Sequence, residues 1–392
     1  MNSVASKKIL LRKNEEKRIL SGHLWVFSNE IQETQGSPSA GDIVQVVSAG
    51  GKSLGFGMYS PHSLICCRLL ASLPLEIDRN FFSERLAAAL QLRRILFPGS
   101  STYRLVHGES DFLPGLIVDR YDDYFVIQAL SAGIDPRLEM ICDVLEDLLH
   151  PVGILARNES PLRTLEGLPL GTTVRRGTID DTIVEEHGIR YNVNLIDSQK
   201  TGLFLDQRMN RLHVREFANG ARVLDCFCNA GGFGLNAARG GAASVIGIDI
   251  SETVIRQARS NAQLNGFDAH FEQGDVFERL AELGQAGSVF DLVILDPPSF
   301  TKSRKNVYAA KKGYRELNMR AMKVLERGGI LVTASCSHHI LPEVFLEIVM
   351  SSALKAGRTL QMLDWRGASP DHPVLPSMPE TRYLKCGVFR VL

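Results

Sequence analysis

The stretch that begins at Arg222 constrains the fold of this chain more than any other part of the sequence. Its first residues form a short apolar run with β character that stops at Asp225, so this acid lies where a buried strand ends and a loop begins. The small residues of 229–234 then allow the backbone to turn sharply and to approach a ligand closely. A short helix and a second apolar run, 244–248, follow and end at Asp249. This order predicts a βαβ nucleotide-binding unit whose ligand lies outside the carboxyl ends of the strands.

The glycine turn after Asp225 does not match the dinucleotide fingerprint G-x-G-x-x-G, because Asn229 stands where the first glycine would be. It resembles instead the D-x-F-x-G/N-x-G-x-F form of S-adenosylmethionine-dependent methyltransferases. In that form, Gly231 lets the backbone pack against the amino-acid end of the cofactor, and Asp225 lies near its ammonium group. Asp249 accepts hydrogen bonds from both ribose hydroxyls. The alternative is a turn that serves only strand–helix packing, but two acids and the glycines in this order favour the cofactor site.

Length and composition narrow the class of protein. A chain of 392 residues exceeds what one hydrophobic core supports and predicts two or three domains. The 44 basic and 44 acidic residues cancel, so any nucleic-acid binding must use local patches. Seven cysteines without regular spacing argue against a disulfide framework and indicate a reducing compartment. The N-terminal residues lack the apolar segment of a signal peptide, and no apolar run is long enough to span a bilayer, so we expect a cytoplasmic protein without a membrane partner.

The first of three expected domains covers residues 1–73 and is rich in strand patterns. Short strand-like runs separated by Gly, Ser and Pro occupy residues 9–11, 43–47, 54–58 and 64–70. The patterns at residues 22–27, 41–44 and 55–57 resemble a PUA domain, a small RNA-binding β-barrel. A basic cluster at the start of this domain would by itself indicate a solvated surface. The resemblance favours phosphate contacts, with Lys7, Lys8 and Arg12 as candidate RNA-binding residues.

The second expected domain, residues 74–188, has a mixed α+β pattern. Apolar residues recur at helical spacing over residues 80–96 and 135–149. Strand-like runs flank Asp122-Asp123, which suits a hairpin turn. We find no catalytic constellation in this segment. We interpret it as a scaffold in which Glu109, Asp111 and Asp119 are ordinary polar positions.

The third expected domain, residues 189–392, alternates strand and helix patterns. Strand patterns cover residues 189–195, 269–273, 289–295 and 330–335, in addition to the two of the βαβ unit. Repeated βα units predict an α/β fold of the Rossmann-like, class I methyltransferase type, with a parallel sheet and helices on both faces.

Several helix boundaries can also be predicted in this domain. Ser251 is expected to cap the helix after Asp249, and the helix before the glycine turn is expected to be capped near Asp206. The helix after the strand at 289–295 is expected to close at Gly328-Gly329, and the last helix to cover residues 342–356.

The predicted cofactor-binding residues lie at strand ends, in the glycine turn and in the polar segment before it. Asp275 follows the strand at 269–273 and is placed to reach an adenine amino group. A capped loop would explain the polar residues around Asp206, but their position just before the βαβ unit favours a second wall of the cofactor site. The complete set is Lys200, Thr201, Gly202, Phe204, Asp206, Arg208, Asp225, Phe227, Asn229, Gly231, Asp249, Ile250, Asp275, Val276 and Asp296.

Two strand ends carry side chains suited to catalysis, Asp296 and Cys336. The Asp-Pro-Pro turn formed by residues 296–300 fixes φ at two positions and makes a rigid ledge. A related turn holds the target amino group in amino-methylating enzymes, so the turn alone would suggest N-methylation.

Carbon 5 of a pyrimidine is too weak a nucleophile to take a methyl group directly, whereas addition of a thiolate at C6 moves electron density to C5. This chemistry needs an exposed cysteine near the cofactor, and the context of Cys336 fits it better than that of the other six cysteines.

The histidines beside Cys336 do not indicate a metal site. His338 and His339 are adjacent on a loop, which is poor chelating geometry, and the chain has no Cys-x-x-Cys partner. We therefore expect no metal.

Together these residues resemble the bacterial rRNA large subunit methyltransferase I family of RNA cytosine-5 methyltransferases. The resemblance covers nearly the whole chain: the PUA-like start, the glycine turn, the Asp-Pro-Pro turn and residues 185–188, 200–202, 205–208, 335–337 and 371–374. It implies S-adenosylmethionine as the methyl donor, 23S rRNA as the substrate and Cys336 as the nucleophile. The Asp-Pro-Pro turn contains no cysteine, unlike that of the two-cysteine RNA cytosine methyltransferases. The base that removes the C5 proton is therefore unassigned, with Asp296 as a candidate.

Basic residues that follow the Asp-Pro-Pro turn are further candidates for RNA binding, namely Lys302, Arg304, Lys311 and Lys312. A solvated helix face would also explain them. The hypothesis is that they hold RNA phosphates while the target base leaves its stack.

Two other functions stay open, a purine N-methyltransferase in which Cys336 is incidental and a non-catalytic RNA-binding assembly factor. The sequence determines neither the modified nucleotide, nor naked rRNA versus an assembled particle as substrate, nor whether the protein forms a homodimer.

Overall fold

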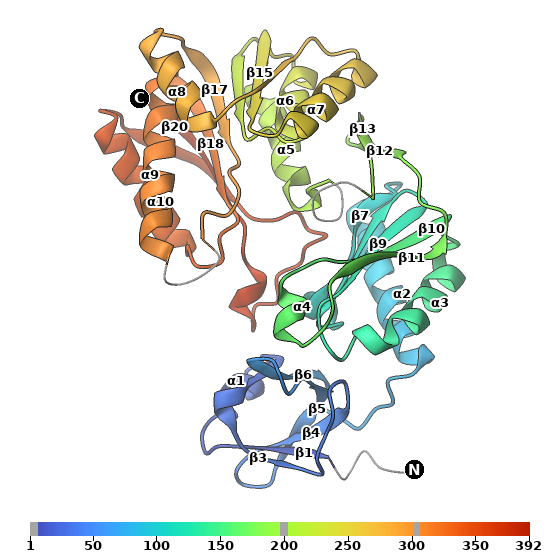
Figure 1. Cartoon of the computed structure of the whole chain (residues 1–392). Coiled ribbons are helices and arrows are strands. Elements are labelled where there is room, and N and C mark those ends of the chain that lie inside the picture. The colour runs from blue at the N-terminus through green and yellow to red at the C-terminus, as the bar shows by residue number, and fades with distance from the viewer. Residues whose placement is uncertain (1–6, 197–202, 302–305) are drawn as a thin grey trace. The chain divides into compact units, whose positions relative to one another are not determined.

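The chain forms two compact units, which are described separately (Figure 1). The computed structural model describes residues 7–196, 203–301 and 306–392. Five predicted site residues lie outside the described residues: Lys200, Thr201, Gly202, Lys302 and Arg304. The first unit comprises Met1–Val184, Val193–Leu203 and Pro370–Thr381, and the second comprises Glu185–Asn192, Phe204–Ser369 and Arg382–Leu392. Within the described ranges, no helix combines the length and the apolar character needed to cross a membrane.

The N-terminal part of the first unit is a six-stranded sheet with the strand order β2-β6-β5-β4-β1-β3. Its elements are β1 (Lys8–Leu11), α1 (Lys17–Leu20), β2 (Trp25–Phe27), β3 (Ile31–Gln35), β4 (Ile43–Val47), β5 (Ser53–Tyr59) and β6 (Ile65–Ala71). Alternating apolar residues such as Ile9, Val44 and Val46 point inward and form its core. Four strand predictions are confirmed. β2 and β3 were not expected, because β2 has only three residues and the residues of β3 after Ile31 are exposed and polar.

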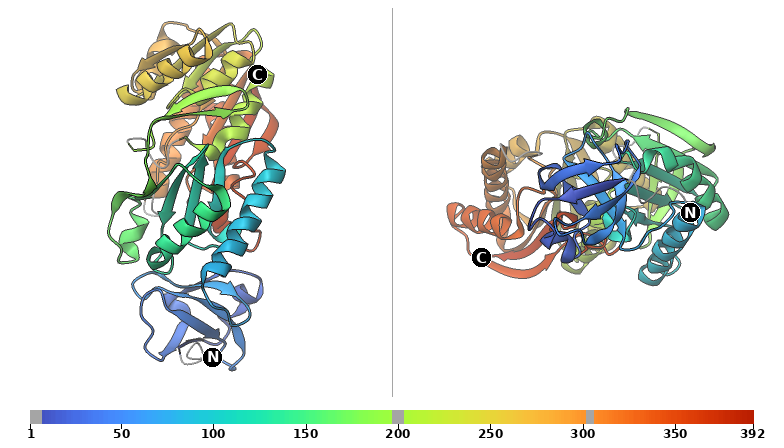
Figure 2. Two further views of the ribbon diagram at one scale, coloured as in Figure 1. Left: turned by 90° about the vertical axis from the view of Figure 1, so that its right-hand side faces the viewer. Right: turned by 90° about the horizontal axis from the view of Figure 1, so that it is seen from below.

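A five-stranded sheet with the order β11-β10-β9-β8-β7 lies in the same unit. Its strands are β7 (Thr102–His107), β8 (Leu116–Tyr121), β9 (Tyr124–Ala129), β10 (Gly153–Asn158) and β11 (Gly171–Gly177). The helices α2 (Arg79–Leu96) and α3 (Leu138–Leu149) pack against each other beside this sheet (Figure 2). The predicted hairpin is confirmed, since Tyr121 pairs with Tyr124 and Asp122 has a φ of 58°.

Asp111 and Asp119, which we expected to be ordinary polar positions, are buried in ion pairs. Arg93 Nη1 lies 2.5 Å from Asp111 Oδ1, and Arg104 Nε lies 2.7 Å from Asp119 Oδ1. The same arginines hold Asp371: Arg93 Nη2 donates to its backbone oxygen at 2.8 Å, and the backbone nitrogen of Arg104 donates to its Oδ2 at 2.9 Å. The pairs therefore have a structural role, and removing one partner would leave a buried charge uncompensated.

The second unit is built on a seven-stranded sheet with the order β16-β15-β14-β17-β18-β20-β19. Its strands are β14 (Arg222–Cys226), β15 (Ser244–Asp249), β16 (His270–Gln273), β17 (Phe290–Leu295), β18 (Leu325–Ser335), β19 (Leu360–Arg366) and β20 (Lys385–Val391). The strand order reverses at β14, so the crevice for a ligand lies at the carboxyl ends of β14, β15 and β17.

The predicted parallel sheet is confirmed for β14 to β18, but the edge formed by β19 and β20 departs from it. β14 to β18 are parallel, but β20 runs antiparallel to both β18 and β19. Parallel neighbours need a crossover connection, usually an α-helix. The connection from β19 to β20 contains only the 3₁₀ turn Pro379–Thr381, so the chain returns in the opposite direction.

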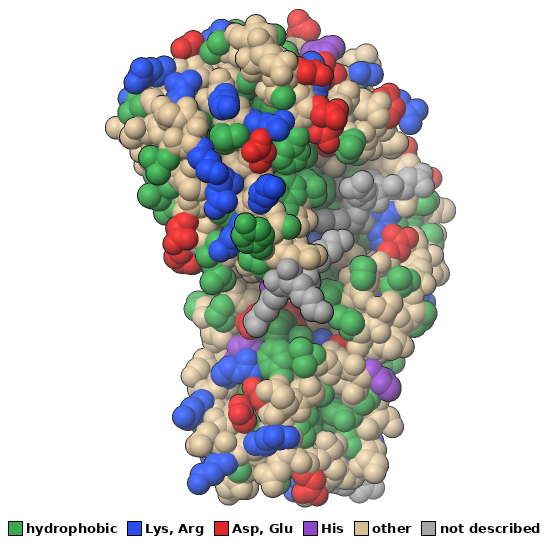
Figure 3. All heavy atoms as spheres, turned by 60° about the vertical axis from the view of Figure 1, so that its left-hand side comes forward, with side chains coloured by type: hydrophobic (Ala, Val, Ile, Leu, Met, Phe, Trp, Pro, Cys, Tyr) green, Lys and Arg blue, Asp and Glu red, His purple; other side chains and the backbone are tan. Residues whose placement is uncertain are grey.

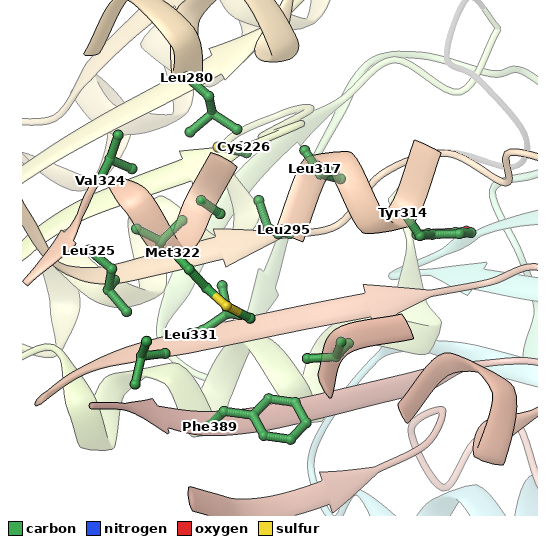
Figure 4. Packing of buried hydrophobic residues seen from close by; sticks show 14 of the residues in the cluster. Cys226, Leu280, Leu295, Tyr314, Leu317, Met322, Val324, Leu325, Leu331 and Phe389 are labelled. Carbon is green, nitrogen blue, oxygen red and sulfur yellow. The ribbon is translucent and has the colours of Figure 1, made fainter. Parts of the chain in front are cut away.

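Helices cover both faces of the seven-stranded sheet (Figure 1). One face carries α8 (Val276–Gln285), α9 (Val307–Lys323) and α10 (Pro342–Lys355), and the other carries α5 (Arg208–Val214) and α6 (Gly232–Arg239), with α7 (Glu252–Asn265) beside α6. In the larger core, Leu317 and Met322 of α9 pack with Leu295 and Leu331 of the strands (Figure 4). Alternate strand residues serve the two cores, as expected for a sheet covered on both faces.

The predicted end of α9 is wrong. The helix ends at Lys323 rather than at Gly328-Gly329, because Leu325 already belongs to β18 and pairs with Phe290 of β17. The two glycines lie where the pairing register of that strand shifts, and Gly328 has a φ of 86°. They interrupt a strand rather than end a helix.

Two predicted helix starts are confirmed in position, but neither Ser251 nor Asp206 caps its helix through its side chain. Ser251 occupies the N-cap position of α7, but its side chain makes no capping hydrogen bond, and its backbone nitrogen donates to Asp249 Oδ1 at 3.1 Å. The segment around Asp206 begins as the 3₁₀ turn Leu205–Gln207, with Phe204 at its N-cap. The carboxylate of Asp206 instead accepts a hydrogen bond from Tyr383.

Candidate active site

The loop between β14 and α6 has an unusual backbone conformation. Phe227, Asn229 and Gly231 have φ values of 62°, 49° and 85°. The backbone nitrogen of Cys228 donates to the Ile248 oxygen at 3.0 Å, which folds the loop against the end of β15. A left-handed φ at a non-glycine residue costs on the order of 1–3 kcal/mol, and two such residues within one loop agree with a functional site there.

Packing also explains the glycine at position 231. A Cβ there would lie 2.9 Å from Cζ of Phe271 and 3.3 Å from Cβ of Ala258, in addition to the strain of its positive φ. Both contacts lie in the protein interior. The contact of this backbone with the cofactor stays a prediction.

The side chain of Asp225 lies beneath this loop and is fully buried. Its Oδ2 accepts a hydrogen bond from the backbone nitrogen of Gly234 at 2.8 Å, and no group in the described part of the chain donates to Oδ1. Burial raises the pKa of this carboxyl to about 8, with a contribution from the negative charges of Asp296 and Asp249. A cation beside Oδ1 would favour the charged form. The buried oxygen is therefore a position at which an ammonium group fits.

Asp249 and Ile250 lie at the carboxyl end of β15. Asp249 Oδ2 accepts from the backbone nitrogen of Asn229, and Oδ1 from that of Ser251, each at 3.1 Å. Each carboxylate oxygen can accept a further hydrogen bond. The side chain of Ile250 is 67% exposed. An acid beside an exposed apolar side chain suits a nucleoside, because the acid can bind the ribose hydroxyls while the side chain packs against the base.

Asp275 and Val276 follow the neighbouring strand, β16. Asp275 is the N-cap of α8, and its Oδ1 accepts from the backbone nitrogens of Phe277 at 2.8 Å and Glu278 at 3.1 Å. The side chain of Val276 is buried in the larger core. Any cofactor contact of Val276 would therefore come from its backbone, and the adenine contact of Asp275 stays a prediction.

Asp296 follows β17, and a chain of buried amides orients its carboxylate. Gln207 Nε2 donates to Asp296 Oδ1 at 2.8 Å, and Asn210 Nδ2 donates to Gln207 Oε1 at 2.6 Å. Both amide side chains are buried, which strengthens the hydrogen bonds between them. In the turn that follows, Pro297 is buried and Pro298 is exposed. The Asp-Pro-Pro turn thus buries the ring of Pro297 in the protein and exposes that of Pro298, in agreement with the predicted rigid surface.

The polar segment before the glycine turn is largely buried. Asp206 Oδ2 accepts from the Tyr383 hydroxyl at 2.6 Å, and the backbone oxygen of Phe204 accepts from Arg211 Nη1 at 2.8 Å. The side chain of Arg208 is buried. These positions support the site from within the protein, and their predicted contacts with the cofactor stay predictions.

Cys336 directly follows β18, the neighbour of β17, and so lies at the same edge of the sheet as Asp296. Of the seven cysteines, all within the described ranges, six are buried and Cys336 is partly exposed. Burial raises the pKa of the six other thiols, to about 12 at Cys142 and Cys386. Exposure at the edge of the sheet therefore distinguishes Cys336 as a candidate nucleophile.

Buried hydroxyl groups fix the backbone on both sides of Cys336. The Ser335 hydroxyl donates to the Tyr314 hydroxyl at 3.0 Å. The Ser337 hydroxyl lies 2.9 Å from the Tyr314 hydroxyl and 2.9 Å from Ser299 Oγ. Because Tyr314 belongs to α9 and Ser299 to the Asp-Pro-Pro turn, this network connects the residues on both sides of Cys336 to the turn that contains Asp296.

Comparisons with known proteins agree with this geometry. A model of the S-adenosylmethionine-dependent methyltransferase family matches residues 158–389, and a model of a PUA-like domain matches residues 9–72. The Ribosomal RNA large subunit methyltransferase I of Tolumonas auensis is 40% identical over 99% of this chain and 100% of that protein. The chain belongs to the ribosomal RNA large subunit methyltransferase I family. The protein of the same name from Escherichia coli O139:H28 is 37% identical, also over 99% of this chain and its own full length.

Solved structures show the same fold. A Streptococcus mutans protein assigned as a SAM-dependent methyltransferase has a TM-score of 0.85 at 21% identity and covers 98% of this chain and 99% of that chain. A second protein assigned as a methyltransferase, complexed with SAH, has a TM-score of 0.86 with the same identity and coverage. The predicted fold class and the predicted cofactor, S-adenosylmethionine, are confirmed. The domain boundaries at residues 73 and 188 stay predictions.

The described residues fit S-adenosylmethionine. Asp249 can bind the ribose hydroxyls, Ile250 offers an apolar surface to the adenine, and the buried Oδ1 of Asp225 suits the ammonium group.

The predicted RNA-binding residues of the first unit differ in their surroundings. Lys7 Nζ lies 2.6 Å from Asp42 Oδ2, and Arg12 Nε donates to the backbone oxygen of Ile31 at 3.2 Å. Lys8 lies in β1 and is half-buried. Their role in RNA binding stays a prediction.

The other described candidates lie near the start of α9. Lys312 is exposed and Lys311 is half-buried, while Tyr308, one turn before Lys312, is 83% exposed. Figure 3 shows several Lys and Arg side chains gathered on one face of the second unit. Because α9 follows β17, its first turns lie toward the edge of the sheet that carries Asp296.

Two polar residues of the site were missing from the predicted set, Gln207 and Lys385. Gln207 was recognised as part of the polar segment beside Asp206, but its bond to Asp296 spans 89 residues and had no sequence signal. Lys385 begins the apolar strand β20, and a lysine at a buried position of such a strand was the available signal. No group of three or more His, Cys, Asp or Glu side chains that could hold a metal occurs in the described part of the chain.

Proposed function

We propose that this protein methylates carbon 5 of a cytosine in large-subunit rRNA, with Cys336 as the nucleophile that adds to C6. The observation that carries the proposal is the partial exposure of Cys336, against six buried cysteines, at the strand end beside Asp296. The relatives that match nearly the full length are named as large-subunit rRNA methyltransferases, which supports rRNA as the substrate class. The PUA-like segment supports RNA binding.

The proposed reaction has three steps. The sulfur of Cys336 forms a bond to C6, and the electron pair of the 5,6 double bond moves to C5. C5 then takes the electrophilic methyl group that bound S-adenosylmethionine would supply, and S-adenosylhomocysteine would leave as the neutral thioether. A base then removes the C5 proton, the double bond forms again, and the S–C6 bond breaks to return the thiolate. Asp296, held by Gln207, is the candidate base.

Replacement of the cysteine tests the proposal. Cys336→Ala should abolish methylation of rRNA, with a loss of at least about a thousandfold in rate, since the nucleophile is removed. Its affinity for S-adenosylmethionine, measured by calorimetry, should stay within about twofold of the wild type. RNA containing 5-fluorocytosine should form a covalent adduct with the wild type and none with the variant. Cys66→Ala, which removes a buried thiol, is the matched control and should keep both turnover and adduct.

Retained turnover in Cys336→Ala would overturn the proposal and favour a purine N-methyltransferase. The Asp-Pro-Pro turn is the observation that supports this second candidate. Mass spectrometry of rRNA nucleosides with and without the enzyme separates the two, because one produces 5-methylcytosine and the other a methylated purine. Absence of S-adenosylmethionine binding in calorimetry would instead point to an RNA-binding assembly factor.

A further inference from the structure

A buried lysine, Lys385, lies next to the candidate nucleophile. It is the first residue of β20, is 2% exposed, and pairs in the sheet with Ser335, the residue before Cys336. Its Nζ donates to the backbone oxygen of Ser337, the residue after Cys336, at 2.7 Å. A second hydrogen bond joins Nζ to the backbone oxygen of Tyr383 at 2.8 Å. The ammonium group is thus fixed from two sides beside Cys336.

The charge of Lys385 acts on Cys336. Burial lowers the pKa of the Lys385 ammonium to about 8, and a negative charge at Cys336 acts in the opposite direction and raises it. The interaction is mutual, so the ammonium favours the thiolate form of Cys336. A buried ammonium is costly unless it has hydrogen bonds and a partner charge, and the two carbonyls together with a thiolate meet both needs.

Other titratable groups surround this pair. Burial, and a charge at Cys336, raise the pKa of the Tyr314 phenol on α9, which stays neutral at pH 7. Partial burial and the positive charge of Lys385 lower the pKa of His338, whose ring lies 5.4 Å from that of Tyr383. Of Tyr314, His338 and Lys385, the lysine is therefore the one that carries a charge at pH 7. His339 follows on the same loop, and Asp296 directly follows the neighbouring strand, β17.

We propose that the ammonium group of Lys385 stabilises the thiolate of Cys336, which makes Lys385 a positioning residue for the nucleophile. The inference rests on the proposed function of Cys336 and deepens it. It explains how a cysteine at the edge of the sheet can be a thiolate at neutral pH.

The reactivity of Cys336 toward iodoacetamide tests this directly in the full-length protein. In Lys385→Met, the midpoint of the alkylation rate against pH, followed at Cys336 by mass spectrometry, should move upward by about one unit or more. The rate at pH 7 should then fall about tenfold for each unit. Lys385→Arg keeps the charge and should recover part of the rate. Lys323→Met, an exposed lysine at the end of α9, should change nothing. An unchanged midpoint in a folded Lys385→Met protein would overturn the inference.

A reciprocal measurement does not depend on the folding of that variant. The titration of Lys385, followed by NMR in lysine-labelled protein, should have a higher midpoint in the wild type than in Cys336→Ser, where no thiolate forms. Equal midpoints would overturn the inference. The outcome is separable from that of the proposed function: turnover retained by Cys336→Ala defeats the cytosine chemistry, whereas unchanged alkylation in Lys385→Met defeats only the role of Lys385.

Discussion

Asp225 links the stability of the protein to its cofactor site through one buried carboxyl group. Because burial raises its pKa to about 8, the folded protein holds this proton more tightly than the unfolded chain, in which the pKa is near its ordinary value of 3.8. The protonated carboxyl of Asp225 therefore makes its full contribution to the free energy of unfolding at low pH. This contribution is lost as the pH rises from about 4 through 8. Asp225→Asn removes the titration.

We expect the melting temperature of the cofactor-free wild type to fall relative to that of Asp225→Asn by roughly 5 °C between pH 5 and pH 9, as measured by thermal unfolding. Asp291→Asn is the matched control. The pKa of Asp291 is lowered by Arg222, so its contribution is already complete above pH 5 and should not change over this range. If the melting temperatures of the wild type and Asp225→Asn changed equally with pH, Asp225 would not have the raised pKa that the prediction requires.

Individual residues differ in how far the sequence could predict them. Asp225, Asp249, Asp296 and Cys336 could be placed because each ends an apolar run, and the ends of parallel strands meet at one edge of a sheet. Lys385 could not be placed, because its position beside Cys336 depends on the antiparallel pairing of β20 with β18. That pairing brings together residues far apart in the sequence and has no local pattern.

At the scale of elements, the contact between α9 and the end of β18 determines how firmly Cys336 is held. Tyr314→Phe removes the hydroxyl that bonds to Ser335 and Ser337, both of which are fully buried. Loss of a hydrogen-bond partner from buried groups costs about 1–3 kcal/mol. We expect a lower melting temperature and a methylation rate reduced by roughly tenfold, measured as kcat, with unchanged affinity for S-adenosylmethionine.

Tyr308→Phe provides the control on the same helix. Its ring is 83% exposed, so removing the hydroxyl should leave the melting temperature unchanged. A variant at Tyr314 with wild-type kcat would show that the hydroxyl network serves only stability. Weakened S-adenosylmethionine binding would show that it acts on the cofactor site rather than on the nucleophile.

The elements themselves divide into those with strong periodic patterns and those without. β14, β15 and β17 were predicted from continuous apolar runs, and α2 and α3 from apolar residues at helical spacing. The end of α9 was mistaken because Gly328-Gly329 has the composition of a helix stop, whereas the strand had already begun at Leu325. Tertiary pairing overrode the local glycine signal there.

At the scale of the whole molecule, each of the two units is built from three separate segments of the chain, whereas the sequence motifs predicted consecutive domains. Pro370–Thr381 belongs to the first unit, although the chain on both sides of it belongs to the second. The buried hydrogen bonds of Asp371 with Arg93 and Arg104 hold this segment in the first unit. The sequence presented residues 371–374 only as a family motif, because the arginines that bind them lie more than 260 residues away.

Because the net charge of the molecule is zero, RNA binding must depend on local groups of basic residues. The lysines of α9 allow this to be tested. Lys311→Glu with Lys312→Glu reverses two charges in the turns of α9 nearest the site. If they bind phosphates, RNA affinity should fall by about tenfold or more at low salt. The slope of log affinity against log salt should become shallower by about 0.7–0.9 for each phosphate that is no longer neutralised. Fluorescence anisotropy with an rRNA fragment at several salt concentrations measures both quantities.

The matched control reverses two charges at the other end of the same helix and just beyond it, Lys323→Glu with Arg327→Glu. Both residues are exposed. Each double variant replaces two basic residues by two glutamates, so the change in net charge is the same. Lys323 lies about 18 Å along the helix from Lys311, at the rise of about 1.5 Å per residue, and away from the carboxyl edge of the sheet. A general loss of attraction to RNA would weaken both double variants equally. A phosphate-binding surface beside the site would weaken the first alone, because only its lysines lie in the turns of α9 toward the carboxyl edge of the sheet.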